Sequence, residues 1–339
     1  MRREPALEKF LAAMAGVLAC ATAQAQWSIG APGNREAPAG RHRYVMLVFA
    51  NPIPGREVEF NEWYTNTHMG DLVQLDGWVG AQRFRIVTNV QPRPTAAGYA
   101  HGYLIIWDLE ETEANLALAR MTAAISGGKS RLGAAFNYTP GAGVNGTFEA
   151  ISPRMTRPDG KGPSMPDPSD NKTPRSNRYV LMEFENALSG KDLEFEKAAT
   201  QKIPAMLSLP GWMAAQRFRM ADTPGRPSVK PKHLTIWETE GATAQSVNET
   251  LQRGLQNGTV LNNPAADMST AELVYWEPIT PYITKQDFVR YGTCSASSPR
   301  QRRAINRSAA MLMAAVQLVG VLLRKHLWSS DNQRRLSGH

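Results

Sequence analysis

The hydrophobic pattern begins with a short strand and continues as one face of a helix. Residues 44–49 are an apolar run rich in strand-forming side chains, and turn residues follow at 51–55. Residues 56–75 then carry apolar and aromatic side chains about one helical turn apart, at Phe60, Tyr64, His68, Leu72 and Leu75. This spacing predicts a helix that ends at Asp76-Gly77.

Three further strands and a second helix complete this pattern. Short runs rich in apolar and strand-forming residues predict strands at 78–88, 101–109 and 145–151. An Ala-rich stretch predicts a helix at 111–126. The resulting order is β-α-β-β-α-β, which is the order of a ferredoxin-like domain.

The whole pattern occurs a second time, about 135 residues later. Arg43–Asn51 matches Arg178–Asn186, and Gly77–Arg85 matches Gly211–Arg219. Matched blocks in the same order, separated by small gaps, indicate an internal duplication. The second copy predicts strands and helices at 178–185, 190–208, 212–220, 232–239, 241–256 and 270–277.

The duplication sets the expected domain organisation. We expect ferredoxin-like domains at 43–151 and 178–280, joined by a proline-rich polar linker at 152–177 that serves as an unfolded tether. A four-stranded sheet of this kind covers one face with its two helices and leaves the other face bare. The sequence therefore predicts an α+β protein in which the two tandem domains pack sheet to sheet within one chain.

The N-terminal residues carry the features of an export signal. Basic residues precede an apolar run from Phe10 to Ala23, and the triplet Ala23-Gln24-Ala25 has a small residue at each end. We predict that residues 1–25 are a cleaved signal peptide and that the mature chain is periplasmic or secreted. A loose lipoprotein pattern makes anchoring through Cys20 an alternative, and an ordinary first helix is another.

The positive charge belongs to the C-terminal tail. The chain has a net charge of +8, and residues 296–339 hold eight basic residues against one acidic residue. The central body is neutral, which gives no case for binding nucleic acid. Two cysteines exclude a disulfide framework and a Cys-rich zinc site. The apolar run and basic flank at 309–328 predict contact with a membrane surface, with a docked helix or a translation frame error as alternatives.

The stretch Asn51–Arg85 resembles the dimeric α/β-barrel superfamily, especially its EthD-like branch. The resemblance rests on Trp63-Tyr64 and His68 in the helix, on the Leu75-Asp76-Gly77 turn, and on Gln82-Arg83-Phe84 in the following strand. It implies an intramolecular form of that barrel, made by two fused copies. It does not select a reaction, because the superfamily includes cofactor-free monooxygenases, haem-dependent enzymes, polyketide cyclases and lactone isomerases.

The residues that carry candidate chemistry lie on the first helix. Tyr64 and His68 are four residues apart and should face the sheet together. An imidazole in an apolar pocket can transfer protons near neutral pH, and Asp71 lies within reach of orienting it, so we predict both as catalytic. Trp63, Tyr64 and Trp107 would form an aromatic wall for a flat substrate. In the resembling family, the matching histidine is the usual candidate for proton transfer.

The second copy lacks this set. Lys202 aligns with His68, Ala205 aligns with Asp71, and alanines replace the Trp-Tyr pair. This is the pattern expected if only the first copy keeps a site and the second is structural. The alternatives are a packed histidine bonded to a carbonyl group, or a haem or metal ligand. A single histidine without a second strong ligand argues against a dedicated metal site.

An arginine is the remaining candidate for binding. A buried Arg83 would suit a planar anion such as a carboxylate or a phenolate, because its guanidinium group presents a rigid fork of donors. The same Gln-Arg pair recurs in the second copy as Gln216-Arg217, which favours a scaffold role for both pairs.

These features together predict an exported protein that binds a small, apolar, aromatic or polyketide-like molecule in its first domain. If it is an enzyme, His68 would transfer a proton in an isomerisation, a cyclisation or a cofactor-independent oxidation. These residues call for no cofactor, although the resemblance leaves haem open. The alternative is a non-catalytic periplasmic binding or scaffolding protein.

Overall fold

The computed structural model describes residues 37–90, 101–139, 143–157, 177–221 and 232–287. The chain divides into two compact units, Met1–Lys285 and Gln286–His339, and almost all described residues belong to the first. The predicted signal peptide, most of the predicted tether and the tail at 296–339 lie outside the described residues.

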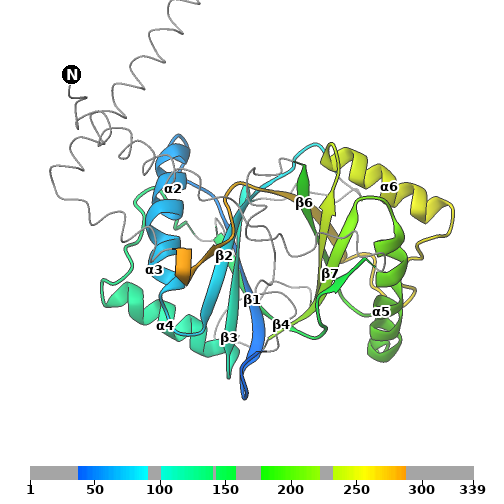
Figure 1. The fold of residues 1–339 in the computed structure, drawn as a ribbon, viewed down its shortest axis with the longest axis horizontal. Coiled ribbons are helices and arrows are strands. Elements are labelled where there is room, and N and C mark those ends of the chain that lie inside the picture. Colours follow the sequence, from blue (N-terminus) through cyan, green and yellow to red (C-terminus); the bar gives the residue numbers. More distant parts are fainter. Residues whose placement is uncertain (1–36, 91–100, 140–142, 158–176, 222–231, 288–339) are drawn as a thin grey trace, which may run out of the picture. The chain divides into compact units, whose positions relative to one another are not determined.

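The first copy contains its elements in the expected order (Figure 1). The strands are β1 (His42–Ala50), β2 (Trp78–Ile86), β3 (Tyr103–Glu111) and β4 (Gly143–Ala150). The helix between β1 and β2 has three parts, α2 (Glu57–Trp63), the π-helical turn η1 (Tyr64–His68) and α3 (Met69–Val73). Helix α4 (Ala114–Ser126) connects β3 to β4.

The second copy repeats this arrangement. Its strands are β6 (Arg178–Glu185), β7 (Trp212–Met220), β8 (His233–Glu240) and β9 (Glu272–Pro278). Its helices are α5 (Asp192–Ser208) and α6 (Ala244–Gln256). Two short strands are additional, β5 (Met155–Thr156) and β10 (Ile283–Thr284). The predicted α+β fold with two ferredoxin-like repeats is confirmed.

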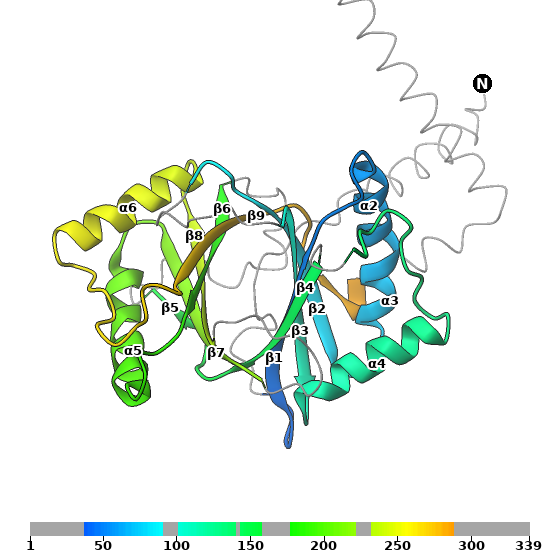
Figure 2. The same cartoon turned by 180° about the vertical axis from the view of Figure 1, so that it is seen from behind.

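The eight long strands close into one antiparallel barrel (Figures 1 and 2). The strand order is β2-β3-β1-β4 in the first half and β7-β8-β6-β9 in the second. Strand β4 pairs with β7 across one seam, and β9 pairs with β2 across the other. Each of these strands therefore has a neighbour on both sides, which removes the exposed edges that favour aggregation.

Each seam is held by residues that directly follow the last strand of the opposite half. The Gln82 side chain donates to the Thr280 carbonyl oxygen at 3.0 Å, and the Arg83 backbone N–H donates to the Thr280 hydroxyl at 3.0 Å. The pair Gln216-Arg217 makes the same two bonds to Ser152, at 3.1 and 3.0 Å. The recurring Gln-Arg pair thus has a scaffold role through its glutamine side chain and its arginine backbone.

The first residues of the predicted tether belong to the described structure. Residues 152–157 continue from β4 along the other half, where β5 pairs with β7. Strand β10 makes the equivalent pairing with β2, beyond residue 280, where we expected the second domain to end. The sequence pattern does not indicate either strand. Each has two residues, too few to show a hydrophobic period, and each pairs with a strand of the other half.

Side chains from all eight long strands fill the barrel. The Phe49 ring lies 6.3 Å from that of Phe184 and 5.8 Å from that of Trp276, measured between ring centroids, so the two halves are in direct contact. The predicted packing of the two bare sheet faces is confirmed. The buried members of this core are Val45, Leu47, Phe49, Phe84, Leu104, Ile106, Phe148, Val180, Met182, Phe184, Phe218, Leu234, Ile236, Val274 and Trp276.

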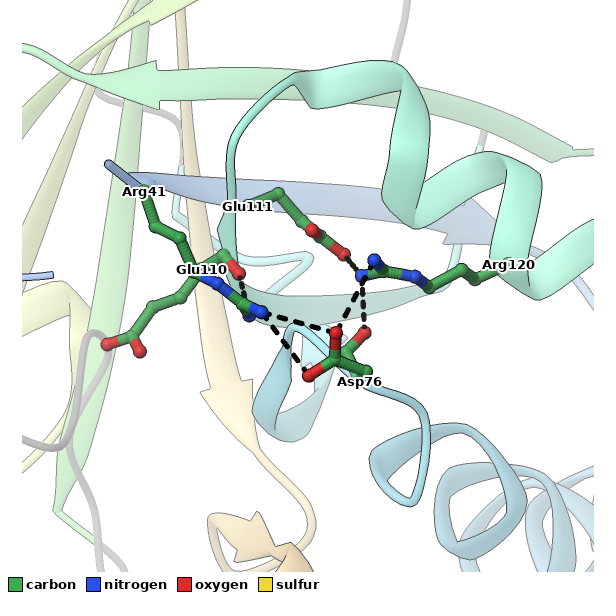
Figure 3. Close-up of polar contacts among 5 residues, drawn as sticks. All are labelled: Arg41, Asp76, Glu110, Glu111 and Arg120. Carbon is green, nitrogen blue, oxygen red and sulfur yellow. Dashed lines mark hydrogen bonds and ion pairs between the residues drawn. The ribbon is translucent and has the colours of Figure 1, made fainter. Parts of the chain in front are cut away.

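A polar network joins the helices of the first half to its sheet (Figure 3). Arg120 of α4 pairs with the buried carboxylate of Glu111 and donates to the Asp76 carbonyl oxygen at 2.9 Å. Arg41 pairs with the Asp76 carboxylate at 3.2 Å. Gly77 is required in this turn, because its φ is +79° and a Cβ atom would overlap the Glu111 carboxylate. The network anchors the end of the helix that carries His68.

We predict that the barrel core is a main source of stability. Phe184→Ala should lower the free energy of unfolding by about 3–5 kcal/mol, because Phe184 is fully buried and contacts rings of the other half. Leu193→Ala is the control, because Leu193 is 85% exposed and its loss should change stability by less than about 0.5 kcal/mol. Chemical denaturation measures both values, and equal effects would contradict the assignment of the core.

Candidate functional site

The helix that carries His68 contains one π-helical turn. The Met69 backbone N–H bonds to the Tyr64 carbonyl oxygen, five residues earlier, instead of the usual four. A regular α-helix has 3.6 residues per turn, so side chains spaced by four residues would gradually leave one face of the helix. With the π turn, Phe60, Tyr64, His68 and Leu72 are all buried on the side that faces the sheet. Such turns are rare and often occur at functional sites.

Alignment of the two sequence repeats places one additional residue in the helix with the π turn. Phe60 and Phe195 are 135 positions apart, whereas Gly77 and Gly211 are 134 apart. The matching helix of the second half, α5, is α-helical throughout. Because the fold forms without the extra residue in the second half, the insertion makes η1 a candidate functional feature of the first half.

His68 lies in an aromatic environment. Its ring stacks on that of Trp63 with centroids 4.7 Å apart, and it meets the Tyr64 ring edge-on at 5.0 Å. The Trp107 ring lies 6.3 Å away, and its N–H donates to the Tyr64 hydroxyl. The structure therefore brings together His68 and the three aromatic residues that the sequence predicted around it.

Asp71 reaches His68 only through Ser130. The His68 Nδ1 atom lies 3.1 Å from the Ser130 hydroxyl, and the Asp71 carboxyl group is hydrogen-bonded to that same side chain. We expected Asp71 to orient the ring directly, and the structure instead places Ser130 between the two. Since a carboxylate can only accept, the Ser130 hydroxyl donates to Asp71 and accepts from Nδ1–H. This assignment leaves Nε2 as the basic nitrogen of the ring.

Burial keeps the imidazole neutral. Only 7% of His68 is exposed, and desolvation lowers its pKa from 6.5 to about 4. At neutral pH the ring therefore carries a lone pair and no charge. Burial also raises the pKa of Asp71, although its hydrogen bonds to Ser130 and Arg131 oppose that change.

The segment 130–136 covers this histidine. The Trp63 indole N–H donates to the Arg131 carbonyl oxygen at 3.1 Å, and Gly133 lies so close that a Cβ atom there would overlap the Trp63 ring. Trp63 itself is only half-buried. Trp63 and Ser130 of this segment are therefore in direct contact with the His68 ring.

Arg83 lies on the other side of Tyr64. Its guanidinium carbon is 4.8 Å from the centre of the Tyr64 ring and 5.2 Å from that of Phe60. It donates to the Asn61 side-chain oxygen at 2.6 Å and to the Thr65 hydroxyl at 2.7 Å. Arg83 is 1% exposed, and burial lowers its pKa to about 10, so it stays charged at neutral pH.

The second half has different polar groups at the place that corresponds to His68. Lys202 pairs with the buried carboxylate of Glu183 at 2.5 Å, and Trp237 donates to the same carboxylate at 3.0 Å. Val260 aligns with Ser130. A buried ion pair therefore takes the place of the His68 contacts in the second half. That the second half has a structural role alone stays a prediction.

A groove of about 510 Å³ opens at the seam between β2 and β9. Tyr103 forms part of its wall, and its hydroxyl donates to Glu57. Asn61 donates to the same hydroxyl at 3.3 Å. Hydrogen bonds of Asn61 therefore link Tyr103 in the groove wall to the buried Arg83. His68 does not line the groove, whose lining residues are Glu57, Arg85, Ile86, Val87, Thr88, Asn89, Gly102, Tyr103 and Glu277.

Sequence reasoning missed Asn61, Tyr103 and Ser130. Ser130 follows α4 and has no local signal that relates it to His68, which precedes it by 62 residues. Asn61 does have a signal, because it aligns with Glu196 of the second repeat, where a carboxylate takes the place of its amide.

The described residues contain neither a metal-binding cluster nor a membrane-spanning helix. Among the described residues, no group of three or more His, Cys, Asp or Glu side chains could hold a metal ion. No helix in the described ranges is long and apolar enough to cross a membrane. The predicted membrane-contact segment at 309–328 lies outside them.

Two fused ferredoxin-like repeats that share one closed barrel give this chain a dimeric α/β-barrel fold. No protein-family model and no curated protein matches it. An anthrone oxidase-like protein is a similar solved structure, with 12% identity, a TM-score of 0.43, and coverage of 74% of this chain and 96% of that one. A chlorite dismutase variant from Candidatus Nitrospira defluvii has 15% identity, a TM-score of 0.38, and coverage of 70% and 92%. Similarity this low carries no argument about activity.

We predict that His68 makes the fold less stable in acid. The unfolded histidine binds a proton below a pH of about 6.5, whereas the folded one binds it only near 4. Stability should therefore fall as the pH drops between these values, by up to about 3 kcal/mol from this group. Denaturation of the wild type and of His68→Gln at several pH values measures this, because His233, whose pKa is also lowered, is common to both. Parallel stability curves would contradict it.

Proposed function

We propose that the first half binds a small, largely apolar aromatic molecule beside the η1 helix, and that His68 transfers a proton to or from it. The supporting observation is the hydrogen-bonded series Asp71–Ser130–His68, which directs the basic Nε2 atom of a neutral imidazole away from Ser130. The surrounding aromatic side chains suit a flat ring. The reaction class would be an isomerisation, a cyclisation or a cofactor-independent oxidation.

The low pKa of His68 is compatible with this role. A neutral imidazole is available as a proton acceptor at pH 7, although a conjugate-acid pKa of about 4 makes it a weak base while the site is closed. Negative charge that develops on a bound molecule beside the ring would raise this pKa in the complex. Proton transfer would therefore be coupled to binding.

The second candidate function is binding without catalysis. It is favoured by the 7% exposure of His68 and by the hydrogen bond that already occupies its Nδ1 atom. A packed histidine with these contacts would hold Trp63 and the segment 130–136 in place around a ligand.

The two functions are distinguished by His68→Gln. If His68 transfers the proton, this variant should turn over a converted compound at least about 100-fold more slowly, because general acid–base catalysis contributes that much or more. Its affinity for the compound should change little, since glutamine keeps a polar side chain there. The measurement is turnover of hydroxylated naphthalene and anthracene compounds by absorbance, with binding by calorimetry.

The control for this experiment is His42→Gln, because the His42 side chain is 58% exposed and lies outside the site. It should leave both turnover and affinity unchanged. Binding with no turnover by any variant would favour the non-catalytic function. Turnover that survives His68→Gln would exclude the proton-transfer role.

We also propose that the chain is exported. Its first 25 residues would be removed, so that the mature protein begins at Gln26. Expression in a bacterial host with the native leader, followed by intact mass measurement, tests this directly. A chain that begins at a lipidated Cys20 would support the lipoprotein alternative, and a chain that retains Met1 in the cytoplasm would contradict export.

A further inference from the structure

In the part of the chain that the structure describes, Arg83 is a buried cation without a carboxylate partner. Its side chain donates to the Asn61 carbonyl and amide oxygens and to the Thr65 hydroxyl, all of which are neutral. Among the described residues, no Asp or Glu side chain pairs with it. A buried charge that lacks an opposite charge lowers the stability of a fold.

The second half shows the paired form of the same arginine. Arg217 donates to the Glu196 carbonyl oxygen and to the Thr200 hydroxyl, as Arg83 does to Asn61 and Thr65. Its Nη2 atom, however, lies 2.8 Å from the Glu196 carboxylate. Asn61 aligns with Glu196, so the residue beside this arginine is neutral in the first half and anionic in the second.

One edge of the Arg83 guanidinium group is incompletely bonded. Within the described ranges, the Nη2 atom has a single acceptor, Asn61 Oδ1 at 2.6 Å. The neighbouring Nε atom is buried and has no hydrogen-bond partner there. Nε and Nη2 form the side fork with which arginine binds the two oxygens of a carboxylate.

This fork lies close to the groove at the β2–β9 seam. Tyr103, which lines the groove, has its ring centre 5.7 Å from the Arg83 guanidinium carbon. Asn61 contacts both the Tyr103 hydroxyl and Arg83. Rotation of these two side chains would connect the groove to the fork, and Phe60 and Tyr64 would flank an entering ring.

We propose that Arg83 binds the anionic group, a carboxylate or a phenolate, of the molecule that the first half accepts. This inference rests on the proposed function, because it assigns an anion to that same ligand. The ligand supplies the counter-charge that Glu196 supplies to Arg217 in the second half. The apolar part of the ligand would then lie along Tyr64 towards His68, since the Tyr64 ring contacts both Arg83 and His68.

The test compares 2-naphthoate with 2-naphthamide, which have the same ring system and nearly the same size and differ in charge. Calorimetry at pH 7.5 measures both affinities. The wild type should bind the carboxylate at least about tenfold more tightly than the amide, because hydrogen bonds between charged groups are the stronger kind. Asn61→Glu should reduce this preference to about twofold or less, because it supplies an internal carboxylate to Arg83 as in the second half.

Asn61→Gln is the matched control, because glutamine has the shape of glutamate without its charge. It should keep the preference for naphthoate. Loss of the preference in both variants would overturn the charge argument, and so would its survival in Asn61→Glu. If Asn61→Glu does not fold, Asn61→Asp places the same charge on the shorter side chain and carries the same expectation.

The wild-type ratio alone separates this inference from the proposed function. Equal affinity for naphthoate and naphthamide would overturn the anion site and leave an apolar aromatic site standing. Binding of neither compound would contradict the proposed function and, with it, the anion site. A preference for naphthoate that depends on the charge at position 61 supports both.

Discussion

Closure of the eight-stranded barrel holds the two halves of this chain together. A single ferredoxin-like repeat leaves one sheet face and two strand edges without a partner. In this chain the second repeat covers that face, and the pairings β4–β7 and β2–β9 satisfy the edges. Residues from both halves complete each seam, so neither half has a finished sheet alone. The helices outside the barrel can therefore change their polar residues without changing the fold.

The two halves use this freedom differently. In the second half, buried charges meet opposite charges at equivalent places, as Lys202 meets Glu183 and Arg217 meets Glu196. In the first half, a neutral histidine and an arginine held by neutral groups take these places. An unpaired buried charge is unfavourable for stability, and among the described residues Arg83 lacks the carboxylate that Arg217 has. This difference is the basis for the proposed anion site.

The π turn is a further difference between the two halves. One inserted residue lets the helix present aromatic and polar side chains at intervals of four along a single face. Tyr64 stands in the middle of this face, with His68 on one side and Arg83 on the other. A ligand that binds Arg83 through its anionic group and reaches His68 with its ring would contact all three side chains. The second half, without the insertion, has alanine at the position of Tyr64.

The order of strands and helices and the aromatic surroundings of His68 could be predicted from the sequence, because they follow from local periodicity and from repeated residue types. The sequence did not reveal β5 and β10, because a short strand is specified by its pairing partner across the seam. It did not place Ser130 between Asp71 and His68, or Asn61 and Tyr103 beside Arg83, because these contacts join segments far apart in the chain. Which charges are paired became evident from the three-dimensional arrangement, since pairing depends on distance in space and on burial, and neither can be read from spacing along the chain.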